Sequence, residues 1–144
     1  MRTASKCYCI QFRRAANYLT KQYDRRLQPA GLTVNQFSLL SNLDRLETAN
    51  VSELAEYVGL ERSTLVRTLK PLLERGWIRD AAKPGTRDRA IQLTEEGRNT
   101  LVKARTYWKE AQAEVEKELG REGIAELRRI MEKLYMDEGK AEKR

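Results

Sequence analysis

Arginine, lysine, serine and threonine side chains alternate with leucines between Glu61 and Arg75. The leucines recur at helical spacing, and the positions between them can donate and accept hydrogen bonds or carry positive charge. These positions are Arg62, Ser63, Thr64, Arg67, Thr68 and Lys70. Base edges offer donors and acceptors and the groove rims are phosphate, so this combination suits a helix lying in the major groove of DNA. An ordinary solvated helix face is the simpler alternative.

The loop that follows carries a second group of cations. Short apolar runs at 77–79 and 90–93 flank a loop with the turn signal Pro84-Gly85, which predicts a β-hairpin. The loop holds Lys83, Arg87 and Arg89. Long cations on a narrow projection can reach a phosphate or enter the minor groove. A basic hairpin directly after a polar helix favours DNA binding over two solvated surfaces.

A short helix is predicted before the polar one. Ser52 can cap it, Leu54 and Val58 face inward, and Gly59 can take the left-handed conformation that ends it. The following helix is expected to bury Leu65, Val66, Leu69, Leu72 and Leu73, with Pro71 bending it after the first turns. Short helix, turn, polar helix and hairpin together outline a winged helix-turn-helix. The predicted fold class is therefore mainly α with a small β-hairpin wing.

Further amphipathic helices flank this module. Apolar residues recur at spacings of three and four over 8–27, Thr33 can cap the next helix, and Thr94 begins a long helix that reaches Gly120, after which a last helix follows. A small winged domain cannot bury all of these stripes, so a second copy of the chain is the economical partner. We expect a single chain, 1–144, in which 33–97 form the winged region and 6–30 and 98–138 form dimerisation helices.

Composition excludes several classes of function. The formal net charge is +7, which indicates an anionic partner, and no apolar run approaches the roughly 20 residues of a membrane span. With no secretory signal visible near the start, a cytoplasmic location is expected. The chain has no histidine, only two cysteines and no glycine-rich phosphate loop, so we expect no enzyme, metal or cofactor. Two alternatives stay open: a hydrolase using carboxylates alone, and a dimeric adaptor that keeps the fold without binding DNA.

Several segments in order resemble the MarR family of winged-helix regulators. They are Gly31-Leu32-Thr33 with Gln36-Phe37-Ser38-Leu39-Leu40, Leu54-Ala55 with Gly59-Leu60, Ser63 to Leu69, Leu72 to Ile78, and Leu93-Thr94-Glu95-Glu96-Gly97. The resemblance spans nearly the whole chain. It implies a homodimer that binds a pseudo-palindromic double-stranded operator, usually as a repressor, and releases it when a ligand or an oxidant acts. It also makes Arg62 and Arg67 the leading candidates for base or phosphate contacts.

The resemblance extends to the wing, with one departure. The family commonly places an Asp-x-Arg element a few residues before the Leu-Thr pair. Arg87 matches the arginine, but Gly85 stands where the aspartate belongs. Asp88 is a candidate substitute.

Two release signals are compatible with the chain. The first helix is similar to that of the organic-hydroperoxide-sensing branch of the same family, which places Cys9 on the sensing cysteine and Tyr23 on an assisting tyrosine. From Cys9 to Tyr23 a helix rises about 21 Å, so these side chains could meet only between subunits. A thiol on an apolar face can equally be a packing residue. The other signal is a small aromatic ligand in a pocket lined by Tyr8, Phe12, Tyr107 and Trp108, although an apolar dimer core also accounts for these aromatics.

Overall fold

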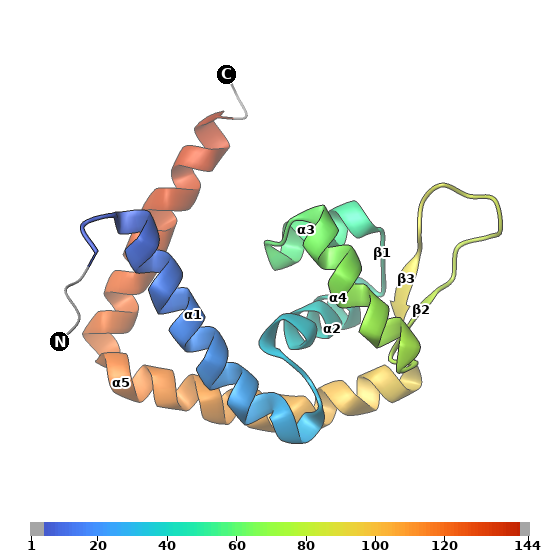
Figure 1. The fold of residues 1–144 in the computed structure, drawn as a ribbon, viewed down its shortest axis with the longest axis horizontal. Coiled ribbons are helices and arrows are strands. Elements are labelled where there is room, and N and C mark those ends of the chain that lie inside the picture. The colour runs from blue at the N-terminus through green and yellow to red at the C-terminus, as the bar shows by residue number, and fades with distance from the viewer. Residues whose placement is uncertain (1–4, 142–144) are drawn as a thin grey trace. The chain divides into compact units, whose positions relative to one another are not determined.

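The computed structural model describes residues 5–141, with side chains for residues 5–135, and shows a mainly helical chain with one small antiparallel sheet (Figure 1). The elements in chain order are α1 (Tyr8–Leu27), the short 3-10 helix η1 (Gln28–Ala30), α2 (Val34–Leu46), β1 (Thr48–Ala49), α3 (Val51–Val58), α4 (Arg62–Glu74), β2 (Ile78–Asp80), β3 (Ile91–Leu93) and α5 (Glu95–Ala141). The predicted fold class is confirmed. Two compact units divide the chain, Met1–Trp108 and Lys109–Arg144.

The core of the first unit is a cluster of mainly aliphatic side chains from α2, α3, α4, the sheet and the first turns of α5, with Leu27 at the end of α1 and Leu32 before α2. Its largest fully buried members are Leu27, Leu39, Leu40, Leu43, Leu54, Leu65, Leu69, Leu72, Ile78, Ile91 and Leu101. Burying one such side chain contributes about 1.5–3 kcal/mol. Because three of these leucines belong to α4, the core fixes which face of α4 points outward.

The N-terminal caps of α2 and α3 show one confirmed prediction and one error. Thr33 caps α2 as predicted: its hydroxyl accepts from Gln36 N at 3.2 Å, and the Gln36 side chain accepts from Thr33 N at 3.0 Å. The sequence places the cap of α3 at Ser52, but α3 begins at Val51, directly after the capping residue Asn50, whose Oδ1 accepts from Glu53 N at 2.8 Å. Ser52 lies inside the helix, and its hydroxyl is available for a different contact.

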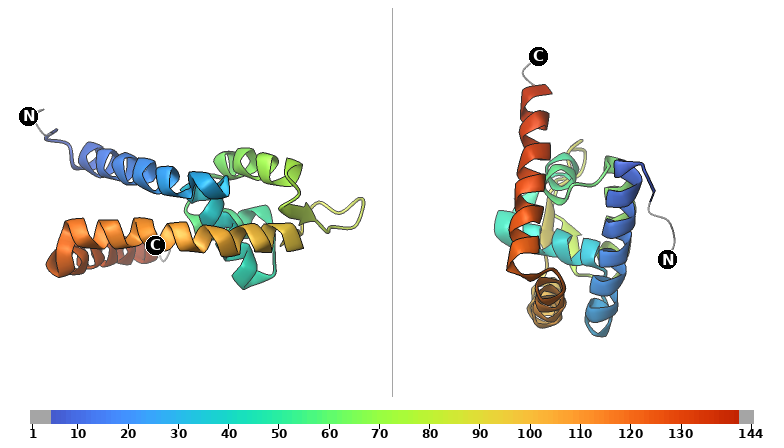
Figure 2. Two further views of the ribbon diagram at one scale, coloured as in Figure 1. Left: turned by 90° about the horizontal axis from the view of Figure 1, so that it is seen from below. Right: turned by 90° about the vertical axis from the view of Figure 1, so that its left-hand side faces the viewer.

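The sheet has the strand order β1-β3-β2, with both pairs antiparallel. The predicted hairpin is β2 and β3, and β1 is an additional strand of two residues that the sequence pattern did not indicate. A chain of side chains crosses all three strands: Arg79 Nη2 donates to Gln92 Oε1 at 2.8 Å, and Gln92 Nε2 donates to Thr48 Oγ1 at 2.9 Å. Figure 2 shows the loop between β2 and β3 extending beyond the helices around it.

The backbone of Trp77 joins the base of this hairpin to the first turn of α5. Thr94 N donates to the Trp77 carbonyl at 3.0 Å, and Thr94 Oγ1 donates to the Gly76 carbonyl at 2.6 Å. Thr94 also caps α5 as predicted, since its hydroxyl accepts from Gly97 N at 3.0 Å. Gly97 lies so close to the Trp77 carbonyl oxygen that a Cβ at this position would overlap it.

The helix α5 contains a break at Gly120, whose backbone dihedrals are φ 69° and ψ 173°. The predicted end of one helix and start of another is therefore confirmed at this residue. In the second unit, large apolar side chains of α5 are exposed in the single chain, including Leu127, Leu134 and Tyr135. Among the described residues, no helix combines the length and the apolar character that crossing a membrane requires.

Candidate nucleic-acid interface

The outward face of α4 carries the polar residues singled out in the sequence. Arg62, Ser63, Arg67 and Lys70 are exposed, and the opposite face buries the leucines of the core. Thr64 and Thr68 lie at the boundary and are half-buried. The Thr68 hydroxyl donates to the Thr64 carbonyl at 2.9 Å, and Arg67 Nη2 donates to Thr64 Oγ1 at 3.4 Å. The arginines and Ser63 are thus better placed for an incoming ligand than the two threonines.

Val66 departs from the prediction that it packs inward. Its side chain is 40% exposed, and it lies one helical turn after Arg62 on the outward face. The buried stripe of α4 runs through Leu65, Leu69 and Leu72, which leaves the position after Leu65 rotated by about 100° toward solvent. An apolar side chain therefore stands among the cations of this face.

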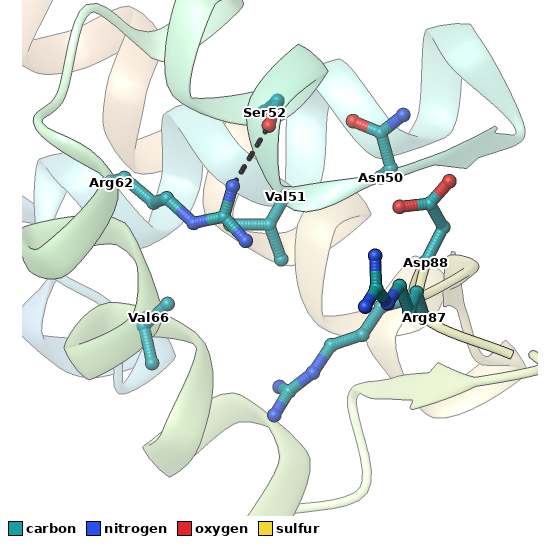
Figure 3. Close-up of a pocket in the computed structure, with 8 residues that line it drawn as sticks. Asn50, Val51, Ser52, Arg62, Val66, Arg87 and Asp88 are labelled. Carbon is teal, nitrogen blue, oxygen red and sulfur yellow. Dashed lines mark hydrogen bonds between the residues drawn. The ribbon is translucent and has the colours of Figure 1, made fainter. Parts of the chain in front are cut away.

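Arg62 is held by α3. Its Nη1 donates to Ser52 Oγ at 3.2 Å, a contact that is possible because Ser52 does not cap α3 (Figure 3). This bond directs the guanidinium along the surface between α3 and the wing. Sequence reasoning missed this role for Ser52.

The wing presents Lys83, Arg87 and Arg89, all exposed. Its tip is a turn closed by Thr86, whose backbone N donates to the Lys83 carbonyl at 3.2 Å and whose hydroxyl donates to the same oxygen. Gly85 within this turn has a φ of 87°, a left-handed backbone conformation that residues other than glycine rarely adopt. A glycine therefore suits this position better than the aspartate of the family element.

The base of the wing is closed by Asp80. Its Oδ1 accepts hydrogen bonds from Ala82 N and Ala90 N, both at 3.0 Å. These two backbone donors, with a smaller contribution from the positive charge of Arg89, lower the pKa of the Asp80 carboxyl below its ordinary value. This role could have been inferred from the sequence, because aspartate side chains often accept a hydrogen bond from the backbone amide two residues later, here that of Ala82, and so form turns.

Three arginines, Arg62 of α4 and Arg87 and Arg89 of the wing, line one hollow of about 180 Å³. Figure 3 shows Arg62 and Val66 on one side of it and Arg87 and Asp88 on the other. Its lining residues are Asn50, Val51, Ser52, Arg62, Val66, Arg87, Asp88 and Arg89. With three guanidinium groups and one carboxylate, the hollow is positively charged and suits an anionic group such as a phosphate. Arg62 and Val66 also line a second, open depression, together with Glu61, Ser63 and Arg67.

The residues predicted for sensing lie outside this surface. Cys7 and Cys9 are exposed free thiols at the start of α1, and Tyr23 is half-buried further along the same helix. Cys9 is thus not a packed core residue within the single chain. Among the described residues, no group of three or more potential ligand side chains (His, Cys, Asp or Glu) is positioned to hold a metal ion.

The four aromatic residues predicted to line a ligand pocket fall into two different environments. Tyr8 is 77% exposed and Phe12 44% exposed on α1. Tyr107 and Trp108 are half-buried against the core, and the Trp108 ring stacks on Phe37 with centroids 5.7 Å apart. This stacking accounts for Trp108 as a packing residue.

Known proteins resemble this chain in sequence and in structure. The MarR family model matches residues 32–87. The transcriptional regulator MosR of M. tuberculosis is 37% identical with a TM-score of 0.81, covering 94% of this chain and 97% of that one. A structure of MosR in complex with DNA is 40% identical with a TM-score of 0.73, covering 90% and 98%. The transcriptional repressor CouR bound to p-coumaroyl-CoA is 25% identical with a TM-score of 0.80, covering 90% and 92%.

A curated relative of the helix-turn-helix type matches the chain over part of its own length. The uncharacterised HTH-type transcriptional regulator YwoH of Bacillus subtilis (strain 168) is 30% identical over 86 residues, which are 60% of this chain and 63% of that protein. The match to the family model covers α2, α3, α4 and the wing as far as Arg87, and so includes the lining residues of the hollow other than Asp88 and Arg89. The chain belongs to the MarR family of winged-helix transcriptional regulators.

Proposed function

We propose that this chain is a sequence-specific double-stranded DNA-binding regulator that acts as a homodimeric repressor on a pseudo-palindromic operator. The observation that carries the proposal is the convergence of Arg62 from α4 with Arg87 and Arg89 from the wing on one positive hollow. Existing structures of MosR and CouR with DNA support the same use of the fold. A protein that binds chromosomal operators works in the cytoplasm, where we place it.

The two elements have different tasks in this proposal. The outward face of α4 enters the major groove, where Arg67 reads base edges and Ser63 makes a shorter contact. The wing follows the backbone, and Arg87 and Arg89 bind phosphates or reach into the minor groove. The hollow between α4 and the wing receives a DNA phosphate at the rim of the major groove, next to Arg62.

The proposed dimer is supported by apolar surface that the single chain leaves exposed. On α1, Tyr8, Phe12 and Tyr18 are 77%, 44% and 51% exposed, and α5 exposes further large apolar side chains after Gly120. Large apolar side chains exposed in this way mark contact sites in proteins free in water. A partner chain that covers both helices also sets the spacing of the two α4 helices, which must match one helical turn of DNA, about 34–36 Å. Sedimentation velocity should therefore give twice the chain mass, and a monomer would contradict the proposal.

Operator binding tests the proposal directly. Fluorescence anisotropy with a duplex from the region upstream of the gene should give tight binding that weakens steeply with salt, because phosphate contacts release counterions. A random duplex of equal length is the control and should bind much more weakly. Binding without a salt slope, or no binding to either duplex, would favour the adaptor alternative.

Cys9 is the proposed site of release by oxidation, supported by its exposure at the start of α1. The thiolate attacks the terminal oxygen of an organic hydroperoxide, and the S–O bond forms as the O–O bond breaks, giving a sulfenic acid at Cys9. The alkoxide that leaves takes a proton from water and departs as the alcohol. Tyr23 of a second chain assists, because the two positions on one helix are too far apart.

The thiol proposal is tested with the same anisotropy measurement. Hydroperoxide treatment should release the operator from the wild-type chain and from Cys7→Ser but leave Cys9→Ser bound. If oxidation releases none of them, the signal is the alternative small aromatic ligand, and phenolic acids should then be titrated against the bound complex. Loss of ligand response in Phe12→Ala would place that ligand at the predicted aromatic residues.

A further inference from the structure

Asp80 occupies an unexpected place for an acidic residue in a DNA-binding wing. It is the last residue of β2, where it pairs with Ile91 of β3, and the loop 81–90 begins immediately after it. This loop holds the cations of the wing. A carboxylate here is repelled by the phosphates that the neighbouring arginines attract, so its electrostatic effect on DNA binding is unfavourable.

The contacts of Asp80 connect the two ends of the loop. One carboxylate oxygen, Oδ1, accepts from Ala82 N at the start of the loop and from Ala90 N at its end, each at 3.0 Å. A backbone hydrogen bond from Ala81 N to the Ala90 carbonyl, at 2.8 Å, lies beside them. The loop is thus closed at its base by one side chain and one backbone bond. Arg89 directly precedes Ala90, so its backbone position depends on this closure.

Asp88 provides an internal comparison, because it carries the same charge in the same loop. Among the contacts of the described residues, it has no hydrogen bond to the loop backbone, and its side chain is exposed at the hollow. The sequence made Asp88 the candidate substitute for the missing aspartate of the family element. The hydrogen bonds to the wing backbone belong to Asp80 instead.

We propose that Asp80 is a positioning residue that holds the base of the wing so that Arg87 and Arg89 face the DNA backbone. The inference rests on the proposed DNA-binding function and assigns Asp80 no contact with DNA. Its consequence has an unusual sign: truncating this acidic side chain to alanine weakens DNA binding, although the net charge of the protein becomes more positive. Simple electrostatics predicts the opposite.

Three variants of the full chain separate geometry from charge. Asp80→Ala removes the acceptor and the charge, Asp80→Asn keeps an acceptor oxygen without the charge, and Asp88→Asn removes a charge from the same loop without touching the closure. Anisotropy with one duplex at several salt concentrations gives the affinity and the salt slope of each. We expect Asp80→Ala to bind about tenfold more weakly with a salt slope lower by about one to two, because one or two arginines lose their phosphates. Asp80→Asn and Asp88→Asn should bind as tightly as the wild-type chain or more tightly.

A structural readout that does not require DNA accompanies this series. In nuclear magnetic resonance spectra, the amide protons of Ala82 and Ala90 should exchange faster with solvent in Asp80→Ala and keep their protection in Asp88→Asn. Thermal unfolding of Asp80→Ala should follow that of the wild-type chain, since Asp80 is exposed and outside the core.

The outcomes distinguish this inference from the function on which it rests. If Asp80→Ala binds as tightly as the wild-type chain or more tightly, the positioning role is wrong while DNA binding stands. If Asp80→Asn is as weak as Asp80→Ala, an acceptor oxygen at this position does not account for the effect and the inference is overturned. If the wild-type chain itself binds no duplex, the proposed function fails and the inference fails with it.

Discussion

The helix α4 and the wing present arginines to the same hollow, but different forces hold them in place. Three leucines of α4 are fully buried, so its orientation depends on the whole core. Within the described loop 81–90 no side chain is buried, and the loop is held by hydrogen bonds at Asp80 and between Lys83 and Thr86. The position of the α4 arginines can therefore change only if the core changes. The position of the wing arginines can change while the core stays intact. Each of the following tests addresses this difference.

The largest effect is expected from Leu69→Ala in α4. Leu69 is fully buried, and truncating such a residue costs about 2–5 kcal/mol of unfolding free energy. Urea denaturation should show this loss, and DNA binding should fall with the folded fraction. Val66→Ala, three residues earlier on the same helix, is the matched control and should change the stability by only about 0.5 kcal/mol or less. Equal losses in both variants would mean that the buried and exposed faces of α4 are wrongly assigned.

Arg67→Ala should affect recognition and leave stability unchanged. A bidentate contact between arginine and guanine contributes about 1–3 kcal/mol of discrimination between base pairs. We expect the binding free energy for the operator to weaken by that amount and the binding free energy for a random duplex to change less. Competition between the two duplexes for the protein measures both. Arg129→Ala, an exposed arginine of α5 outside the proposed interface, is the control. A uniform loss on both duplexes would move Arg67 from base reading to phosphate binding.

Arg87→Ala is the corresponding change in the wing. Because a phosphate contact carries no sequence information, this variant should weaken binding to operator and random duplexes alike and lower the salt slope by about one. Anisotropy over a salt series measures both quantities. If Arg87→Ala instead lost only operator binding, the wing would read bases and the proposed difference between the two regions would disappear.

Val66 should contribute a smaller, specific effect. An exposed apolar side chain among cations on a major-groove helix can contact the methyl group of thymine. Replacing operator thymines with deoxyuridine, which lacks this methyl, should weaken the wild-type complex by about 0.8 kcal/mol per contact, the value of one buried methylene. The Val66→Ala variant should be insensitive to the replacement. A variant that keeps the full sensitivity would show that another residue makes the contact.

The smallest effect is expected from pH. The pKa of Asp80 lies below its ordinary value, so its carboxylate stabilises the wing at every pH above the pKa of the unfolded chain, about 3.9, and this stabilisation is lost as the pH falls through the lower, folded value. Amide exchange protection of Ala82 and Ala90, corrected for the intrinsic pH dependence of exchange, should therefore stay constant from pH 8 to about 5. Loss of protection near neutral pH would contradict the assigned protonation state.

The elements of the fold could be predicted largely because their signals are local. Thr33 with Gln36, Gly59 and Gly120 each act on neighbouring backbone, and the leucine stripe of α4 follows helical periodicity. The cap of α3 could not be predicted, since Asn50 and Ser52 are both good capping residues. The strand β1 has only two residues, too few for a pattern.

The sequence predicted which cations belong to the site, but not how their side chains are positioned relative to one another. The cations of α4 and the wing are recognisable by type and position, whereas the bond from Arg62 to Ser52 depends on how α3 packs beside α4. Val66 was misassigned because it lies at the edge of the apolar stripe, where a rotation of about 100° separates burial from exposure. The contacts of Asp80 require the hairpin to close first, so they do not follow from local sequence alone.

The junction at Trp77 has a mechanical consequence. Thr94 bonds to the backbone of Gly76 and Trp77, and Gly97 leaves no room for a side chain between α5 and the Trp77 carbonyl. These contacts connect the first turn of α5 directly to the base of the wing, so we expect the two to move together. An effector that displaces the start of α5 shifts the wing arginines without touching them, and substituting Gly97 with even alanine would uncouple the two movements by forcing this contact apart.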